Sequence, residues 1–271
     1  MRLLDLAVRW WEKGGDRIAL VWEELAGFRS FTAGQWARTA RRPRTWGTIY
    51  CALVVVIGYF LLDRPLARFL KAHVSGEFEG FWKTITHLGL GGVWLIPSGI
   101  LTLGLILSML AAPSGEKRER LRRAAWIPGF LFLSMAASGI AGNIIKMLVG
   151  RTRPAMLFDA NVYDFVPLTR GYLTNSFPSG HSQAIFAAMT ALALIFPRYD
   201  LAFLTVALLV AMSRVLTTVH FLSDVVAGAW LGVMITLALH SLLTRRGMDV
   251  RVRFERDRTL LPDQSSKGSP T

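Results

Sequence analysis

Residues 201–243 read LAFLTVALLVAMSRVLTTVHFLSDVVAGAWLGVMITLALHSLL, two apolar runs joined by a short stretch that contains polar side chains. About 20 helical residues cross the hydrocarbon core of a bilayer, so this segment is too long for a single crossing. We expect the chain to turn near residues 221–223, with Ser223 as the N-cap of the second helix. The segment therefore predicts two antiparallel helices that span a membrane.

Apolar segments of similar length occur in the rest of the chain, and together they predict an all-α, polytopic membrane helix bundle. The 271 residues are 52% hydrophobic and 18% charged with a mean hydropathy of +0.40, well above soluble composition. The single Cys51 has no disulfide partner, which excludes a disulfide-stapled secreted domain. The six predicted spans are residues 47–62, 91–112, 124–148, 181–196, 201–219 and 224–243.

The net charge of +13 is distributed unevenly among the predicted loops. The two terminal segments and two alternate loops carry 22 of the 31 lysines and arginines, and by the positive-inside rule they are cytoplasmic. The charge is thus a topology signal, with attraction to anionic lipid headgroups as a second consequence, and we expect no nucleic-acid partner. We expect a multi-pass protein of the bacterial inner membrane with both termini in the cytoplasm. The four basic segments are residues 1–46, 113–123, 197–200 and 244–271.

The predicted spans divide the chain into three parts. Residues 1–46 mix apolar and charged side chains at helical spacing and are typical of an interfacial amphipathic extension, although a soluble cap on the bundle explains them equally well. Residues 47–243 form the six-span core. Residues 244–271 form a polar cytoplasmic tail.

Polar and ionisable side chains gather at the ends of four predicted spans, where burial in hydrocarbon is costly unless they pair or face a wet cavity. With a cytoplasmic N-terminus, odd spans run outward and even spans inward. These ends therefore all reach the same, non-cytoplasmic face of the membrane. The residues concerned are Lys146, Arg153, Ser179, Gly180, His181, Ser213, Arg214, His220 and Asp224.

Each of these residues alone also has a purely structural explanation. Lys146 could extend from a helix end towards the headgroups, Arg153 could anchor at the interface, and Arg214 could pair with Asp224. A single histidine at a helix end is more often structural than catalytic. The grouping of three cations, two histidines and a carboxylate on one face is what favours a functional site.

The chemistry of this group is that of a phosphate site. Three cations and the backbone N–H groups at a helix N-terminus suit a compact anion with several oxygens. One histidine could attack phosphorus while the other protonates the leaving oxygen. Asp224, four residues after His220, could accept a hydrogen bond from one ring nitrogen and orient the other towards the substrate. We expect no metal and no other cofactor, because the fixed cations neutralise the charge.

Three motifs resemble the signature of the type 2 phosphatidic acid phosphatase superfamily: KMLVGRTRP at residues 146–154, PSGH at 178–181, and SRVLTTVHFLSD at 213–224. The resemblance implies a metal-independent phosphatase in which His220 is the nucleophile that carries a phosphohistidine. Asp224 would orient His220, and His181 would be the general acid. Arg151 matches no defining position and is expected to be at most a neighbour that attracts phosphate. The resemblance assigns the phosphoryl oxygens to Lys146, Arg153, Ser179, Gly180 and Arg214.

An outer-face pocket in a membrane protein favours a lipid phosphate whose chains stay in the bilayer while the headgroup reaches the site. Phosphatidic acid, phosphatidylglycerol phosphate, a polyprenyl diphosphate and the phosphates of lipid A all meet this condition. A vanadium-dependent haloperoxidase shares the signature, but such relatives are soluble. A non-catalytic lipid-phosphate binding or flipping protein of the same fold is the remaining alternative. Candidate lid or interfacial aromatics are Phe158, Tyr163, Phe165 and Tyr172.

Overall fold

The computed structural model describes residues 41–74, 76–113, 115–169 and 171–252. The chain divides into two units, Met1–Tyr50 and Cys51–Thr271, and every predicted site residue belongs to the second. Residues 1–40 of the predicted extension and residues 253–271 of the predicted tail lie outside the described part. The predictions for those two segments therefore stay predictions.

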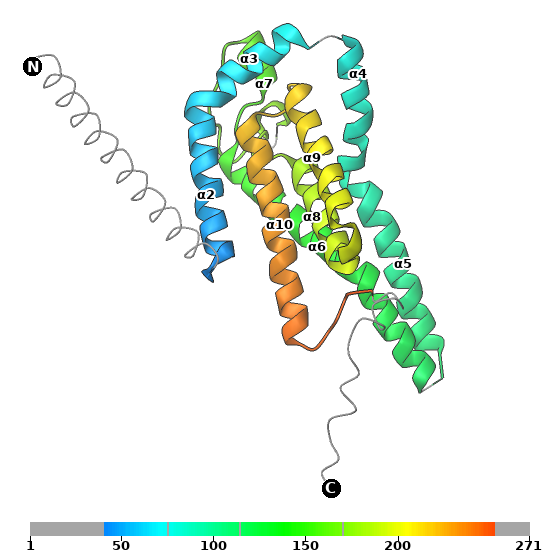
Figure 1. Cartoon of the computed structure of the whole chain (residues 1–271). Helices are drawn as coiled ribbons and strands as arrows, with labels where there is room; N and C mark the ends of the chain where they lie inside the picture. The colour runs from blue at the N-terminus through cyan, green and yellow to red at the C-terminus, as the bar shows by residue number, and fades with distance from the viewer. Residues whose placement is uncertain (1–40, 75, 114, 170, 253–271) are drawn as a thin grey trace, which may run out of the picture. The chain divides into compact units, whose positions relative to one another are not determined.

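The described residues are helical apart from their loops and one isolated β-bridge between Arg151 and Phe165, which confirms the predicted all-α class (Figure 1). The short element η1 is π-helical, and η2, η3 and η4 are 3₁₀ turns. In chain order the elements are α2 (Pro43–Ile57), η1 (Gly58–Leu62), α3 (Asp63–His73), α4 (Gly76–Ile85), η2 (Thr86–Gly89), α5 (Gly91–Ala111), α6 (Glu116–Val149), α7 (Pro154–Asp159), η3 (Tyr172–Thr174), α8 (Gly180–Ile195), η4 (Pro197–Tyr199), α9 (Asp200–Leu216) and α10 (Leu222–Arg245).

Five helical segments within the described residues are long and apolar enough to cross a membrane. The sixth predicted span corresponds to α8, which is apolar but has only 16 residues. Each predicted span therefore matches one apolar helix. The five long segments are Pro43–His73, Phe78–Ala111, Glu116–Val149, Pro197–Leu216 and Leu222–Arg245.

Helix α6 is longer than predicted. It begins at Glu116, so most of residues 113–123, predicted to be a cytoplasmic loop, is helical. Glu119 forms ion pairs with Arg122 at 2.8 Å and with Arg123 at 2.8 Å, about one helical turn away. Such pairs, together with acidic residues in the first turn, favour helix in a segment that is too polar to read as a span.

The connection between α9 and α10 also differs from the prediction. Helix α9 ends at Leu216 rather than at residue 219, and Ser223 is not the N-cap of α10. Phe221 occupies the N-cap position, and its N–H donates to Asp224 Oδ2 at 3.0 Å. The Ser223 side chain donates instead to Asp63 at the start of α3.

Helix α8 lies at the centre of the bundle, where it packs against α6, α9 and α10. Its small side chains Ala187, Ala188 and Ala191 are fully buried. Gly228 and Gly232 lie one turn apart on α10, and a Cβ at either would come within 2.4 Å of a carbonyl oxygen of the α8 region. Small residues at this spacing let two membrane helices approach closely, which fixes the start of α10 beside the start of α8.

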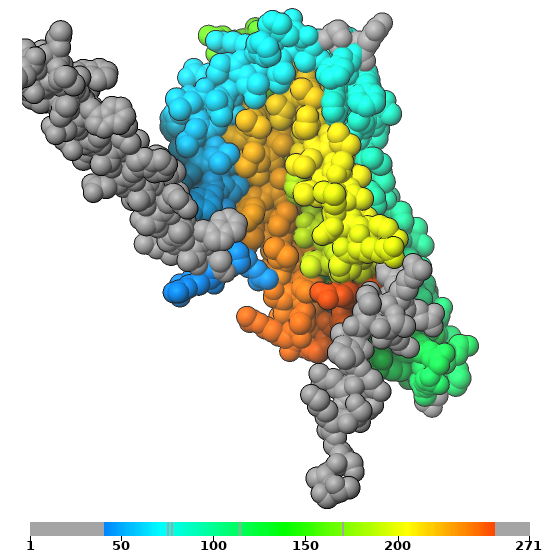
Figure 2. Space-filling view, viewed as in Figure 1, coloured from blue at the N-terminus to red at the C-terminus, as the bar shows by residue number. Residues whose placement is uncertain are grey.

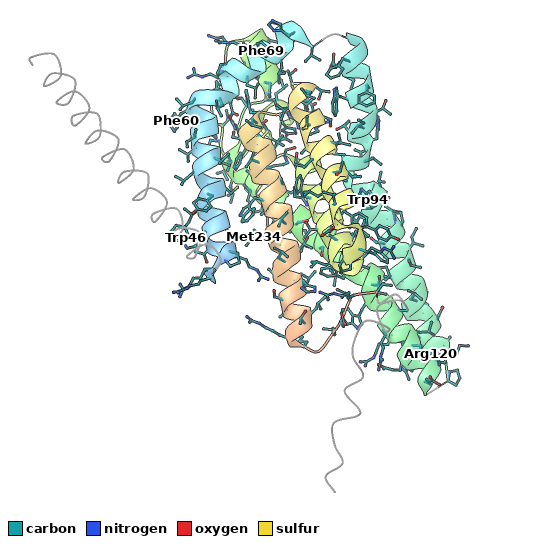
Figure 3. All side chains as sticks on the ribbon, viewed as in Figure 1. Trp46, Phe60, Phe69, Trp94, Arg120 and Met234 are labelled. Carbon is teal, nitrogen blue, oxygen red and sulfur yellow. The ribbon has the colours of Figure 1, made fainter. Side chains whose placement is uncertain are left out.

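Large apolar side chains cover the outside of the second unit, as expected for a surface in contact with lipid. On the face seen in Figure 2, α9 lies between α10 and the α4–α5 arm. Exposed apolar residues include Phe60 on η1 and Ile100 on α5. Arg120 lies near the start of α6 (Figure 3), roughly 40 Å along the helix from Lys146 at 1.5 Å per residue. The basic start of α6 and its site end are therefore at opposite ends of the bundle.

Candidate active site

Three segments far apart in the sequence meet where α6 ends and where α8 and α10 begin. Lys146, in the last turn of α6, donates through Nζ to the backbone carbonyls of Asn175 at 2.9 Å and Pro178 at 2.5 Å. The Ser179 N–H donates to the carbonyl of Asp224 at 2.9 Å. These contacts hold the segment before α8 between the end of α6 and the start of α10.

A glycine ends α6 and turns the chain back towards the bundle. Gly150 has φ +60°, a left-handed conformation that favours glycine, and its N–H donates to the Lys146 carbonyl at 3.0 Å. A Cβ at this position would lie 1.7 Å from the Val166 carbonyl oxygen. Any other residue would therefore displace the loop that carries Arg151 and Arg153.

Helix α8 begins with Ser179 as its N-cap. The Ser179 Oγ accepts from the Ser182 backbone N–H at 3.5 Å and from the Ser182 hydroxyl at 3.0 Å. Gly180 is the first helical residue, and a Cβ there would lie 3.6 Å from Lys146 Cε. The first N–H groups of a helix have no partner within the helix and carry its positive dipole end, so this start can bind an anion next to the lysine.

Two arginines lie beside the start of α8, and each donates a hydrogen bond from one terminal nitrogen of its guanidinium. Arg153 donates to Asn175 Oδ1 at 3.2 Å and stacks on the Tyr172 ring at 4.1 Å, while Arg214 donates to Thr86 Oγ1 at 2.7 Å. The Nε atoms of both arginines are buried and have no hydrogen-bond partner among the described residues. Such desolvated charged donors favour an anionic oxygen as acceptor.

His220 lies in the short loop between α9 and α10. Its backbone N–H donates to the Arg214 carbonyl at 3.2 Å, and its Nδ1 faces Ser176 Oγ at 3.3 Å. Ser176 in turn donates to Asp224 Oδ2 at 2.6 Å. The distance from His220 Nδ1 to Asp224 Oδ2 is 3.7 Å, so the predicted hydrogen bond between the ring and the carboxylate is not direct. The Ser176 hydroxyl contacts both groups.

Burial sets the protonation state of His220. The residue is 3% exposed, and this burial lowers the pKa of His220 to about 3, against the opposing effect of the Asp224 carboxylate. The imidazole is therefore neutral at physiological pH. Because Nδ1 faces Ser176 and Asp224, the lone pair available for attack is that of Nε2.

His181 occupies the first turn of α8, and the end of η2 covers it from one side. A Cβ on Gly89 would lie 3.1 Å from the His181 ring. The ring is close enough to Lys146, Arg153 and Arg214 for their charges to act on it. It makes no hydrogen bond to any described residue, so its polar atoms are available to a substrate.

Two cavities adjoin Lys146. The first, of about 480 Å³, lies between α5, α6 and α8, with Lys146 and His181 in its wall. The second, of about 520 Å³, contacts Lys146 and Asn175. Ile140, an exposed residue of α6, lines both. Lys146 therefore borders spaces that continue along an apolar helix face.

Arg151 does not have the predicted role of a neighbour that attracts phosphate. It is 2% exposed and donates to Asp224 Oδ1 at 2.5 Å and to Asp63 Oδ2 at 2.7 Å. Burial opposes its charge, but the carboxylates outweigh this effect and raise the pKa of Arg151. The structural pair between Arg214 and Asp224 considered from the sequence is also wrong, because the arginine that contacts Asp224 is Arg151.

The four aromatic candidates for a lid take different places. The Tyr163 hydroxyl bonds within the protein: it accepts from Arg151 at 2.6 Å and donates to the Tyr59 carbonyl at 2.8 Å. Tyr172 is exposed and stacks on Arg153. Phe158 packs against the cluster around Phe221 and faces Lys71. Phe165 is exposed and faces Tyr59.

Several residues of the site were not predicted from the sequence. Asn175 and Ser176 carried a weak signal, since they stand just before the PSGH motif. Thr86 and Asp63 had no signal in the sequence. Thr86 is 128 residues from its partner Arg214, and Asp63 is 88 residues from its partner Arg151. Among the described residues, no three histidine, cysteine, aspartate or glutamate side chains are grouped as metal ligands.

Comparisons with known proteins show the family of this chain. The model of the PAP2 superfamily matches residues 128–248. A lipid A 1-phosphatase of Rhizobium johnstonii is 33% identical over 72% of this chain and 78% of its own length, and one of Rhizobium etli is 37% identical over 72% and 82%. A PAP2-type phosphatidylglycerolphosphate phosphatase of Bacillus subtilis, solved by crystallography, has a similar fold, with a TM-score of 0.52 at 21% identity over 73% of this chain and 96% of its own.

Proposed function

Since this chain belongs to the PAP2 superfamily and is a bacterial membrane lipid phosphatase, we propose that it removes the 1-phosphate of lipid A through a phosphohistidine intermediate. The choice of lipid is supported by the two rhizobial relatives, which carry that activity in their names. The observation that carries the chemistry is the grouping of Lys146, Arg153 and Arg214 around His181. The non-catalytic alternative is not favoured, because the chain retains both histidines.

The reaction begins with attack of the neutral His220 Nε2 on phosphorus. The bond from phosphorus to the sugar oxygen breaks, and His181 donates a proton to that oxygen as it leaves. Asp224, through Ser176, stabilises the positive charge that develops on the His220 ring. Water, deprotonated by His181, then attacks the phosphohistidine, and inorganic phosphate and free His220 are formed.

The charge on the phosphoryl oxygens is stabilised by fixed groups of the protein. We assign this role to the side chains of Lys146, Arg153 and Arg214, to the Gly180 N–H and to the Ser179 hydroxyl. The Ser179 N–H itself donates to the Asp224 carbonyl. Preorganised donors of this kind commonly supply the largest part of phosphoryl-transfer catalysis. Because the three cations neutralise the phosphate, the proposed mechanism is metal-independent and uses no cofactor.

The membrane arrangement belongs to the same proposal. The two terminal segments and the two loops at the end of the bundle opposite the site carry most of the lysines and arginines. This excess supports cytoplasmic termini and a site at the periplasmic face of the inner membrane. A six-span core of residues 47–243 would then follow the interfacial extension 1–46 and precede the polar tail 244–271. The exposed Ile140 beside the cavities supports entry of acyl chains sideways from the bilayer.

A panel of pure lipids tests the substrate. We expect phosphate release from lipid A that carries only the 1-phosphate, in detergent and excess EDTA, and little release from lipid A that carries only the 4′-phosphate. Phosphatidic acid, phosphatidylglycerol phosphate and a polyprenyl diphosphate complete the panel. Faster release from any of these three would overturn the assignment to lipid A, and complete loss of activity in EDTA would contradict the metal-independent mechanism.

His181→Ala tests the general acid. We expect kcat for lipid A to fall about 100- to 1000-fold, since a sugar oxygen leaves poorly without a proton. Formation of the phosphoenzyme from p-nitrophenyl phosphate should suffer much less, because nitrophenolate leaves unprotonated. Rapid-mixing experiments should then show a stoichiometric burst of nitrophenolate followed by slow turnover. If the variant loses the same factor in rate with lipid A and with p-nitrophenyl phosphate and shows no burst, His181 is not the general acid.

A further inference from the structure

The buried Arg151 connects the proposed catalytic Asp224 to Asp63, the first residue of α3. Arg151 Nη1 donates to Asp224 Oδ1 at 2.5 Å and to Ser223 Oγ at 2.7 Å. Its Nη2 donates to Asp63 Oδ2 at 2.7 Å and to Tyr163 OH at 2.6 Å. The two terminal nitrogens thus contact four acceptors on α3, α10 and the loop between α7 and η3.

The guanidinium is buried among aromatic rings, and Arg151 is only 2% exposed. Its central carbon lies 5.0 Å from the centre of the Tyr59 ring, 5.1 Å from that of Tyr163 and 4.6 Å from that of Phe221. Asp63 and Asp224 are 1% and 0% exposed. A planar guanidinium with paired donors fits two carboxylates and three ring faces at once, which an ammonium cannot do.

Asp63 extends this contact to the backbone of α10. Its Oδ1 accepts from the Ser223 N–H at 3.0 Å, and its Oδ2 accepts from the Ser223 hydroxyl. Asp63 therefore occupies two donors in the first turn of α10, immediately before Asp224. It belongs to α3, outside the residues 128–248 that match the family model.

We propose that Arg151 is a positioning residue, anchored by Asp63, that fixes the Asp224 carboxylate so that its other oxygen orients Ser176 and His220. Asp224 Oδ1 faces Arg151, while Oδ2 accepts from Ser176 at 2.6 Å and from the Phe221 N–H at 3.0 Å. Arg151 thus acts on the reaction only through Asp224. This inference rests on the proposed role of Asp224 and His220, and it adds α3 to the catalytic framework.

A double-mutant cycle with Asp224→Asn tests this dependence. We expect Arg151→Met to lower kcat about 10- to 100-fold with KM changed less than about 3-fold, because it misplaces a catalytic group without touching the substrate. In the Asp224→Asn background, the same change should cost less than about 3-fold more, since the residue it acts through is already altered. Asp63→Asn should lower kcat by about 10-fold or less, because Arg151 keeps its contact with Asp224.

Two controls keep the outcomes distinct. Arg68→Met removes an exposed arginine of α3 that bonds Asn161, and it should leave kcat and KM unchanged. If Arg151→Met does not fold, Arg151→Lys keeps a cation between the carboxylates, and we expect it to show the same pattern with about a 10-fold loss of kcat.

Other results would overturn the proposal. A rise in KM with unchanged kcat would make Arg151 a substrate-binding residue. Losses that multiply fully in the Asp224→Asn background would show that it acts independently of Asp224. Failure of the proposed function is separate: it would appear as unchanged turnover in His220→Ala, whatever Arg151 does.

Discussion

His220→Ala is expected to reduce phosphate release from lipid A to the level of a blank, a loss of about 10⁵-fold or more, as for removal of a nucleophile from other hydrolases. The change removes the only group proposed to attack phosphorus. The fixed cations would still bind the substrate, so lipid binding should persist. The measurement is inorganic phosphate release by purified protein in detergent, with thermal unfolding recorded on the same sample.

His73→Ala is the matched control for this substitution. His73 is an exposed histidine at the end of α3 whose Nδ1 contacts the Phe69 carbonyl, so its loss removes an imidazole without reaching the site. We expect wild-type rates from it. Acid quenching of wild-type protein during turnover should also capture an acid-labile phosphate that His220→Ala lacks. Near-normal turnover by a folded His220→Ala protein would exclude the phosphohistidine mechanism.

The sequence was sufficient for the order and approximate position of the six apolar helices, because span length and turn residues are local properties. It failed where a polar segment is helical. The beginning of α6 contains five lysines and arginines between residues 117 and 123, which hydropathy treats as loop. The ion pairs of Glu119 stabilise helix there without changing the hydropathy.

The candidate site divides in the same way. Lys146, His181 and His220 could be assigned to one end of the bundle, because alternating spans bring every second connection to the same face. Their immediate partners could not be assigned. Arg151 contacts Asp63 from 88 residues away, and Ser176 contacts Asp224 from 48 residues away. Such pairs depend on how α3, α7 and α10 pack, which no local pattern in one sequence specifies.

His220 and Asp224 are near each other as predicted, but the 3.7 Å between Nδ1 and Oδ2 is too long for the predicted direct hydrogen bond. The interval of four residues from His220 to Asp224 suggested a direct hydrogen bond, but α10 begins only at Leu222, so the two residues do not share a helix. Asp224 Oδ2 accepts from the Phe221 N–H. His220 Nδ1 lies 3.7 Å from the same oxygen. The Ser176 hydroxyl, from the loop before α8, contacts both partners.

Asp224→Asn is the second substitution with a large expected effect, a fall in kcat of about 1000- to 10,000-fold. Both carboxylate oxygens accept hydrogen bonds, Oδ1 from Arg151 and Oδ2 from Ser176 and the Phe221 N–H. An amide can accept on one side only, so one set of donors would face an NH₂ group. The negative charge that stabilises the His220 ring during attack would be lost as well.

Stability must be separated from catalysis in this variant, because removing one member of a buried ion pair costs roughly 3–5 kcal/mol. Asp63→Asn provides the comparison: Asp63 is an equally buried carboxylate on the same arginine, but it has no contact with Ser176 or His220. We expect both variants to lower the unfolding temperature to a similar extent, while only Asp224→Asn loses kcat by three orders of magnitude or more. Equal kinetic losses in the two variants would mean that Asp224 contributes by packing alone, and the orienting role assigned to it would be wrong.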